Sequence, residues 1–387
     1  MAGRFGGYQN EIYLQGLGGA TPAMTTDLSR LEEAAGGVLT PEALGYVAGA
    51  AGAGATMRAN RESFDRWKIV PRMLTGATDR DLSTTLFGTA LPAPVLLAPV
   101  GVQSIVHPEA ELATARAAAG LGVPMILSTA SSRTIEQVAD ANGDGPRWFQ
   151  LYWPNDQDVC ASILERARKA GYTTLVVTLD TWTLAWRPQD LDRAYLPFIR
   201  NEGTAIAMSD PAFRARLEKT PEEDQPTAIL HWVGMFTGTD HGWDQLPSLR
   251  ALWDGPILLK GIQHVDDARR AVDAGMDGVV VSNHGGRQVD GALGALEALP
   301  GIAQAVGEQV EVLFDSGVRT GADMFKALAL GAKAVLLGRP FVYGLGLGGE
   351  DGVRHVLRSL LAEFELTLGL AGYRTPGELT PAALQRS

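Results

Sequence analysis

The sequence predicts a (β/α)8 TIM barrel, a closed sheet of eight parallel strands surrounded by helices. Eight short apolar runs alternate with stretches that have polar helix starts, which is the pattern of parallel strands and their crossover helices. Together the runs extend over about 250 residues, the usual size of this barrel. They lie at residues 95–100, 125–128, 148–152, 175–179, 257–259, 279–281, 310–314 and 334–337.

Helical stretches separate most of these runs. Each of them starts with polar or proline residues and continues with apolar side chains at helical spacing. The clearest span residues 107–121, 131–141, 155–170, 265–274 and 320–330.

The predicted barrel divides the chain into three parts. Residues 1–93 are expected to form an N-terminal arm and helical cap, in which Thr40, Pro41 and Glu42 mark a helix start. Residues 94–370 form the barrel, and residues 371–387 form a C-terminal tail.

One connection is much longer than the others. Roughly 75 residues follow Asp180 before the fifth run, whereas the other connections are short. This insertion, residues 181–250, follows strand 4 and includes an irregular polar segment at 218–226. Insertions at this end of a barrel commonly cover the active site, so we expect a lid, part of it mobile.

Composition narrows the classes of partner. The chain has 33 basic and 44 acidic side chains and a formal charge of −11, which disfavours nucleic acids and anionic membranes as partners. No stretch has the length of an apolar membrane span or the pattern of a signal peptide, and we expect a soluble cytoplasmic protein. The single cysteine, Cys160, lies in an apolar helical context and is predicted to pack as a small hydrophobic residue.

The segment V-S-N-H-G-G-R-Q-V-D, residues 281–290, is the strongest candidate for the chemistry. His284 follows an apolar run, at the strand end where barrel enzymes hold their reactive groups. Gly285 and Gly286 allow unusual backbone angles and the close approach of a flat ligand, and Arg287 offers a two-pronged grip for a carboxylate. An isolated H-G-G is more often a surface turn, so the prediction depends on the other strand ends.

Polar side chains close six of the eight runs. Because strand ends of a barrel surround one mouth, these side chains are expected to converge on a polar ligand. They are Ser128, Gln150 with Tyr152, Thr178 with Asp180, Lys260, Ser282 with His284, and Asp315 with Ser316.

The last two units carry a predicted phosphate site. Gly317 and Arg319 open one helix, and Gly338 and Arg339 close the eighth run. Many barrels bind phosphate after strands seven and eight, on free backbone N–H groups at a helix start. Arginines that tie neighbouring loops together are the alternative.

Lys260 has two chemical interpretations. It could form a Schiff base, as in a lysine-dependent aldolase, or provide a fixed positive charge beside a group that becomes anionic. A barrel that binds a phosphate ligand without turnover is a third possibility. We predict no metal site, because the six histidines show no paired ligand spacing.

The chain resembles the FMN-dependent α-hydroxy-acid oxidase/dehydrogenase family over nearly its whole length, and most closely the lactate 2-monooxygenase branch. The most specific motif is S-N-H-G-G-R-Q. Other matching stretches are Y-Q-N-E-I-Y, Y-V-A-G-A, L-A-P-V-G, F-Q-L-Y-W, T-L-D-T-W, W-R-P-Q-D-L, L-K-G-I-Q-H-V-D-D-A, F-D-S-G-V-R-T-G-A-D and L-G-R-P.

The resemblance implies catalytic and substrate-binding roles. His284 would be the base that begins oxidation of the Cα–OH, Asp180 would orient it, and Lys260 would stabilise negative charge beside the flavin. The residues implied to hold the substrate carboxylate are Arg287, Arg187 and Tyr46, and Tyr152 would lie near the substrate oxygens.

The resemblance also implies an FMN site. Asp315 would bind the ribityl chain, and the phosphate would lie on Gly317, Arg319, Gly338 and Arg339. The residues implied to line the isoalloxazine are Ala98, Pro99, Val100, Gly101, Ser128, Gln150, Thr178 and Ser282.

The branch implies a particular reaction and assembly. Gly101 and the W-R-P insertion resemble the monooxygenase, which keeps the keto acid bound while O2 reacts and so converts lactate to acetate, CO2 and water. A simple oxidase that releases keto acid and H2O2 is the nearest alternative. A homotetramer or homo-octamer is also implied. Departures at Trp153, Leu184 and Val289 leave the size of the substrate open.

Overall fold

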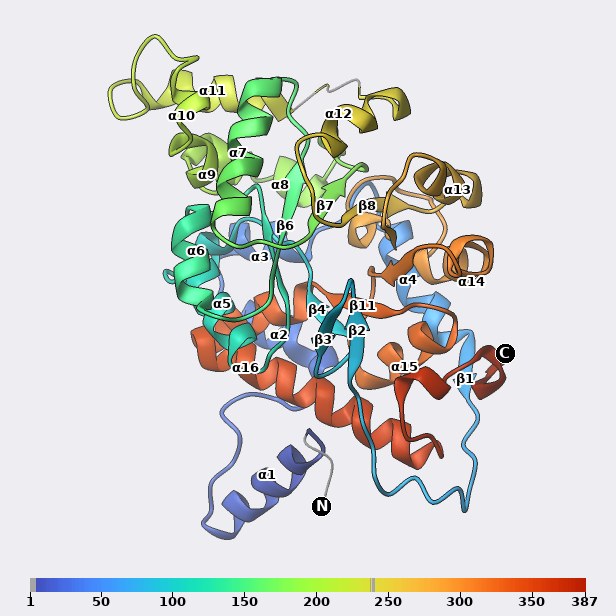
Figure 1. Cartoon of the computed structure of the whole chain (residues 1–387). Helices are drawn as coiled ribbons and strands as arrows, with labels where there is room; N and C mark the ends of the chain where they lie inside the picture. The colour runs from blue at the N-terminus through green and yellow to red at the C-terminus, as the bar shows by residue number, and fades with distance from the viewer. Residues whose placement is uncertain (1–4, 237, 239–240) are drawn as a thin grey trace.

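The computed structural model describes residues 5–236, 238 and 241–387, and its centre is a closed barrel of eight parallel strands (Figure 1). The strands follow chain order around the barrel, and β11 closes it by pairing with β4. The predicted fold class is therefore confirmed. The strands are β4 (Val95–Leu97), β5 (Met125–Ser128), β6 (Arg147–Tyr152), β7 (Leu175–Thr178), β8 (Ile257–Ile262), β9 (Gly278–Val281), β10 (Glu311–Phe314) and β11 (Ala334–Leu337).

Two strand ends differ from the prediction. The first strand ends at Leu97 instead of continuing to residue 100, because Pro99 has no N–H to donate to a ladder. The fifth strand continues to Ile262, and its register shifts between Lys260 and Ile262. This irregularity lies directly after Lys260, at the end of the strand where the chemistry was predicted.

The barrel interior is filled with apolar side chains, and a hairpin closes one of its ends. The hairpin consists of β2 (Thr84–Leu86) and β3 (Thr89–Leu91), and its Phe87 ring lies 5.8 Å from the ring of Trp148. The opposite end, where the strands finish, is the end at which barrel enzymes bind their ligands. The interior side chains include Leu96, Ile126, Trp148, Val176, Leu258, Val280, Leu313 and Leu336.

All five predicted crossover helices are present, within a few residues of their expected bounds. Cys160 is buried on one of them, and burial raises the pKa of its thiol to about 12, in agreement with a packing role. The helices are α5 (Glu111–Ala119), α6 (Ile135–Asn142), α7 (Gln157–Lys169), α13 (Val265–Asp273) and α15 (Gly321–Ala329), with α14 (Ala295–Val306) and the long α16 (Arg339–Leu370) completing the ring.

Short helices precede the barrel. The predicted helix start is confirmed at α3, where the Thr40 side chain accepts a hydrogen bond from the Ala43 N–H. The C-terminal end of the chain returns to this region, since β1 (Trp67–Ile69) pairs with β12 (Leu384–Arg386). The helices are α1 (Gly7–Leu17), α2 (Leu31–Gly36), α3 (Pro41–Ala48) and α4 (Ala55–Asp65). The division into arm, barrel and tail stays a prediction, and residues 1–4 lie outside the described part.

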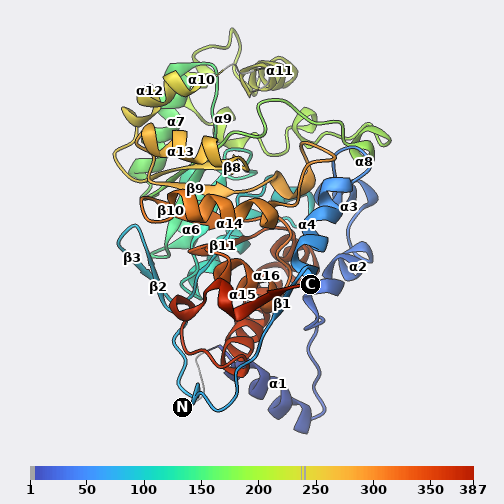
Figure 2. The same ribbon diagram turned by 90° about the vertical axis from the view of Figure 1, so that its right-hand side faces the viewer.

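The insertion after β7 forms a group of short helices at one end of the barrel, opposite to α1 and α16 (Figures 1 and 2). Its elements are α8 (Pro188–Leu191), the 3-10 helix η3 (Pro197–Arg200), α9 (Ala205–Met208), α10 (Pro211–Arg214), α11 (Gln225–Phe236) and α12 (Leu246–Arg250). The predicted mobility of this lid stays a prediction.

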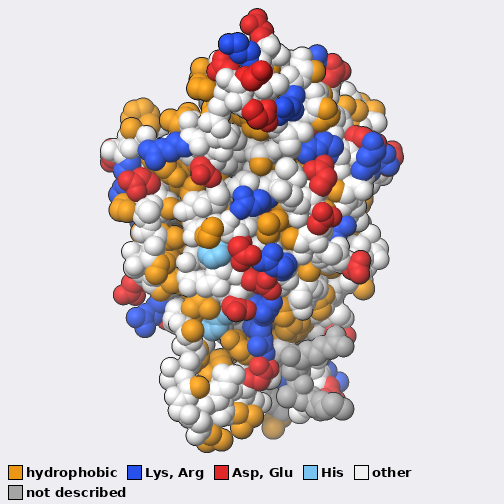
Figure 3. Space-filling view, turned by 90° about the vertical axis from the view of Figure 1, so that its left-hand side faces the viewer, with side chains coloured by type: hydrophobic (Ala, Val, Ile, Leu, Met, Phe, Trp, Pro, Cys, Tyr) orange, Lys and Arg blue, Asp and Glu red, His pale blue; other side chains and the backbone are white. Residues whose placement is uncertain are grey.

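Charged side chains of both signs are interspersed on the face drawn in Figure 3. On this face, the net negative charge therefore does not gather into one acidic patch. In the part of the chain that the structure describes, no helix combines the length and apolarity needed to cross a bilayer.

Candidate functional site

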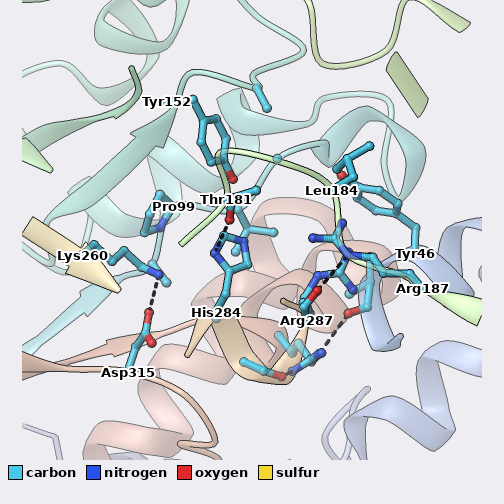
Figure 4. Close-up of a pocket in the computed structure, with 18 of the residues that line it drawn as sticks. Tyr46, Pro99, Tyr152, Thr181, Leu184, Arg187, Lys260, His284, Arg287 and Asp315 are labelled. Carbon is cyan, nitrogen blue, oxygen red and sulfur yellow. Dashed lines mark hydrogen bonds and ion pairs between the residues drawn. The ribbon is translucent and has the colours of Figure 1, made fainter. Parts of the chain in front are cut away.

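A cavity lies at the open end of the barrel, between the strand ends and the insertion. Fifteen of the predicted site residues line it, although they come from distant parts of the sequence. These are Tyr46, Ala98, Pro99, Val100, Gly101, Tyr152, Arg187, Lys260, His284, Arg287, Asp315, Gly317, Arg319, Gly338 and Arg339. The expected convergence on one mouth is thus what the geometry shows (Figure 4).

The H-G-G loop takes the unusual backbone angles that its glycines suggested. His284, Gly285 and Gly286 all have positive φ, at 56°, 66° and 77°. A Cβ on Gly286 would lie 2.6 Å from the backbone N of Met57, so helix α4 packs directly against this loop. The strained turn aims the His284 ring into the cavity and leaves no room for a side chain behind it.

The imidazole of His284 is held by Asp180. The His284 Nδ1 lies 2.8 Å from the Asp180 Oδ1 and 3.1 Å from the Thr181 Oγ1. Burial lowers the pKa of His284 below 6.5, although Asp180 opposes this effect. Burial acts to raise the pKa of Asp180, but the hydrogen bond from His284 and the positive charge of Lys260 outweigh it and the pKa is lowered. Asp180 is therefore ionised and His284 is neutral near pH 7.

Lys260 is fixed by two polar partners. Its Nζ lies 3.1 Å from the Asp315 Oδ2 and donates to the Ser282 Oγ at 3.0 Å. Burial opposes the charge, yet the carboxylates of Asp315 and Asp180 raise the pKa of Lys260 above its ordinary value. The ammonium is therefore a permanent positive charge at the cavity wall, and a neutral amine nucleophile is disfavoured.

Arg187, Arg287 and Tyr46 form a cluster on the opposite side. The Arg187 Nε donates to the Arg287 carbonyl at 3.1 Å, and the Arg287 guanidinium lies 5.1 Å from the centre of the Tyr46 ring. Burial and the nearby Arg187 lower the pKa of Arg287 to about 9. Two guanidinium groups this close, one buried and one half-buried, favour an anionic ligand between them.

Arg319 and Arg339, the two arginines predicted to bind a phosphate, both line the cavity. Arg339 donates to the carbonyls of Val47, Gly285 and Gly49, which ties the barrel to the cap. Burial and the neighbouring Arg339 lower the pKa of Arg319 to about 10. Within residues 5–236, 238 and 241–387, neither arginine has a carboxylate ion-pair partner within 4.0 Å. A dianionic phosphate would compensate both charges.

Five predicted site residues are not on the cavity wall. Asp180 contacts the lining residue His284, as described above. Ser128, Gln150, Thr178 and Ser282, expected along the isoalloxazine, are buried side chains that are not part of the lining. The Ser128 Oγ donates to the Gln150 Oε1 at 2.9 Å, and the Gln150 Nε2 has no hydrogen-bond partner among the described residues.

Two features of the site were not predicted. Thr181 bridges the base and its carboxylate, because its hydroxyl also donates to the Asp180 Oδ1 at 3.0 Å. The signal was its position directly after the strand-end aspartate. The insertion contributes an apolar wall, whose members are Leu184, Leu196, Phe198, Trp232, Val233 and Phe236. The insertion has no strand pattern from which this wall could have been predicted.

No group of three or more histidine, cysteine, aspartate or glutamate side chains with the geometry of a metal site occurs among the residues the structure describes.

The barrel, a base with a carboxylate partner and a buried anion site define a flavin-dependent oxidoreductase barrel, and comparison with known proteins gives the family. The model of the FMN-dependent dehydrogenase family matches residues 35–386. The chain belongs to this family.

Relatives agree over nearly their full length. An FMN-dependent alpha-hydroxy acid dehydrogenase of Penicillium citrinum is 50% identical over 99% of this chain and 96% of its own. An L-lactate oxidase of Lysinibacillus sphaericus is 42% identical over 88% of each chain. Among solved structures, a mandelate oxidase has a TM-score of 0.82 at 39% identity, covering 94% of this chain and 98% of that one.

The cofactor is therefore FMN, and the reaction is oxidation of an α-hydroxy acid. The residues present fit this cofactor. Among the described residues, the half-buried Arg319 and Arg339 have no carboxylate partner where a phosphate would lie, and the Gln150 Nε2 is a buried donor without an acceptor. A donor left in this state costs about 1–3 kcal/mol, which a ligand acceptor would remove.

Proposed function

We propose that the protein oxidises an L-2-hydroxy acid with O2 as the final acceptor and decarboxylates the keto acid before releasing it. With L-lactate as the reference substrate, the products are acetate, CO2 and water. One observation carries the proposal. A neutral imidazole with an ionised carboxylate partner lines the same cavity as the two neighbouring guanidinium groups of Arg187 and Arg287.

His284 is the proposed catalytic base. Because Asp180 is ionised, the His284 Nδ1 carries the proton and donates it, which leaves the Nε2 lone pair free to accept one. The Nε2 takes the proton of the Cα–OH as oxidation begins, and Asp180 stabilises the imidazolium that results.

The substrate carboxylate is assigned to Arg287 and Arg187. Arg187 is buried and Arg287 is half-buried, and the lowered pKa of Arg287 reflects a charge that an anion would stabilise. Tyr46 and Tyr152 line the cavity, and burial raises the pKa of each phenol, so both remain hydrogen-bond donors. They are assigned to the substrate oxygens.

FMN is assigned to the barrel side of the cavity. The residues proposed for its phosphate are Gly317, Arg319, Gly338 and Arg339, with Asp315 for the ribityl chain. The residues proposed for the ring system are Ala98, Pro99, Val100, Gly101, Ser128, Gln150, Thr178, Lys260 and Ser282. When bound, FMN supplies the two-electron acceptor. Lys260 provides positive charge for it.

The second half of the proposed reaction balances without another reactant. Pyruvate and H2O2 together give acetate, CO2 and water, provided the keto acid stays in place while O2 is reduced. Two features support retention of the keto acid. Insertion residues form one wall of the cavity, and Gly101 packs so closely against Ala130 in the wall that no side chain fits there.

A product balance tests the proposal. Lactate oxidised in air should give acetate and CO2 in equal amounts to the O2 consumed, with little free H2O2. The rival is an oxidase that releases keto acid, as the name of the Lysinibacillus relative suggests. Peroxide formed one-for-one with oxidised lactate, measured with a peroxidase dye, would establish the rival.

The Gly101→Ala variant sharpens this test. An added Cβ would lie 2.7 Å from the Ala130 Cβ and still closer to the Ala130 carbonyl oxygen, so the cavity wall must move. We expect earlier loss of the keto acid and a larger share of peroxide. An unchanged balance with full FMN content would contradict retention of the product through this wall.

The family assignment replaces the aldolase and the phosphate-binding barrel that the sequence left open. The ion pair between Lys260 and Asp315 also disfavours a Schiff base, because it keeps the ammonium protonated. Borohydride trapping of a substrate on Lys260, in a protein without flavin colour, would reverse this conclusion.

Three proposals concern the protein as a whole. These are a homotetramer or homo-octamer, a cytoplasmic location, and the division into a cap (1–93), a barrel (94–370) with its lid (181–250), and a tail (371–387). Light scattering of the purified protein tests the first, and limited proteolysis tests the third.

A further inference from the structure

Three aromatic rings of the insertion lie against one another and face the cavity. The ring centres of Phe198 and Trp232 are 4.8 Å apart, and those of Trp232 and Phe236 are 5.1 Å apart. Phe198 belongs to η3 and the other two to α11. Trp232 is only 5% exposed, so this aromatic cluster is a packed wall and not a loose surface group.

Most polar groups of the cavity lie elsewhere, and Arg187, before α8, is the one charged lining residue that the described part of the insertion contributes. His284, Arg287 and Lys260 are all contributed by the strand ends of the barrel and the loops after them. The insertion adds Leu184, Leu196 and Val233 beside the aromatic cluster, so apolar side chains dominate its share of the wall. The two sides therefore contact chemically different parts of a ligand.

A 2-hydroxy acid has three substituents on its reacting carbon besides hydrogen. Two of them, the carboxylate and the hydroxyl, are matched by Arg287 and His284 on the barrel side. The remaining substituent is the side chain, and the aromatic cluster is the surface left for it. A methyl group would bury little apolar area against three rings.

We propose that the preferred substrate carries an apolar side chain larger than methyl, of the arylmethyl or branched alkyl class, and that Phe198, Trp232 and Phe236 determine this specificity. The inference rests on the proposed function. One methylene more or less in an apolar pocket changes selectivity by about tenfold or more. L-Lactate is then a substrate that binds weakly.

The first test compares side chains on the FMN-loaded protein. The protein is mixed anaerobically with L-lactate, L-2-hydroxybutyrate, L-2-hydroxy-4-methylpentanoate or L-3-phenyllactate. The rate at which flavin absorbance is lost, measured over a range of acid concentrations, gives an apparent Kd for each acid. We expect the Kd to fall by about tenfold or more from lactate to the larger acids. Lactate binding as tightly as all the larger acids would overturn the inference.

A substitution in the aromatic cluster provides the second test. Phe198→Ala should raise the Kd of 3-phenyllactate by about tenfold and that of lactate by less than about threefold. Equilibrium binding of phenylpyruvate and pyruvate, followed by the absorbance of oxidised flavin, should show the same split. Tyr13→Ala, on the exposed α1 helix at the opposite end, is the control and should change neither value.

The outcomes distinguish failure of the proposed function from failure of the specificity assignment. If none of the four acids bleaches the flavin, the proposed function is wrong. If lactate bleaches it and Phe198→Ala weakens both ligands equally, only the specificity assignment is wrong. Should Phe198→Ala fail to fold, Leu184→Ala carries the same comparison, because Leu184 is 40% exposed and its loss opens no core cavity.

Discussion

The barrel side and the insertion side of the cavity are held together by different forces. On the barrel side, His284 and Lys260 are each fixed by hydrogen bonds or ion pairs to buried carboxylates. On the insertion side, Phe198 and Trp232 are held by ring contacts and have no charge to orient. Hydrogen bonds and ion pairs fix the distances and angles between atoms narrowly. Apolar packing fixes the shape of a surface and tolerates substitution by other apolar side chains.

This difference indicates a division of labour. The barrel side, together with Arg187 and Thr181 at the start of the insertion, supplies the polar atoms around the reacting carbon, and the apolar residues of the insertion supply the surface that selects the side chain. Substitutions on the barrel side should therefore change the rate of flavin reduction, and those on the insertion side should change which acid binds.

The largest effect is expected for His284→Gln. Glutamine keeps a polar side chain of similar reach but cannot accept the proton, so the limiting rate of anaerobic flavin bleaching should fall by about 10³-fold or more. FMN content should stay the same, because the predicted phosphate residues are untouched. Bleaching at the normal rate would remove His284 as the base.

Asp180→Asn should lower the bleaching rate by about 10²-fold and also move its pH profile. In the wild type, burial holds the pKa of His284 below 6.5, so the rate should be flat above pH 7 and fall in acid as the ring is protonated. Asp180 raises that pKa, so its loss should move the acid limb to lower pH. An acid limb that moves upward would contradict the pairing.

Arg287→Lys should act on binding more than on rate. Lysine keeps the positive charge but not the planar fork, so the apparent Kd of the hydroxy acid should rise by about 30-fold while the limiting rate changes less. Arg193→Lys, on the exposed surface of the insertion, is a matched control. A Kd that is unchanged in Arg287→Lys would place the carboxylate elsewhere.

The smallest effect is expected for Thr181. Thr181→Val removes the hydroxyl that donates to Asp180 and should slow bleaching by about five- to tenfold, and Thr181→Ser should restore most of the rate. Serine and valine variants with equal rates would show that the hydroxyl does not position the base.

Much of the barrel side could be predicted from sequence, because its signals are local. Each strand is a short apolar run, and the polar residue after it must lie at the mouth whatever the details of packing. Local signals were insufficient where backbone pairing between strands, or contact with a neighbouring side chain, determines the structure. Pro99 ends a strand early, and the hydrogen bond between Ser128 and Gln150 joins two neighbouring strands.

The insertion side could not be predicted in the same way. Phe198 and Trp232 are 34 positions apart in the sequence, in a segment without strand periodicity, and only the folded chain brings their rings together. A lid was expected from the length of the segment alone. Its apolar lining depends on tertiary packing that no local pattern records.

Anaerobic flavin bleaching of His284→Gln and Phe198→Ala, measured side by side with L-lactate and L-3-phenyllactate, tests the division of labour most directly. His284→Gln should lose the limiting rate with both acids, and Phe198→Ala should keep that rate and lose affinity for 3-phenyllactate alone. A Phe198→Ala protein that loses the limiting rate with both acids as severely as His284→Gln does would contradict the account.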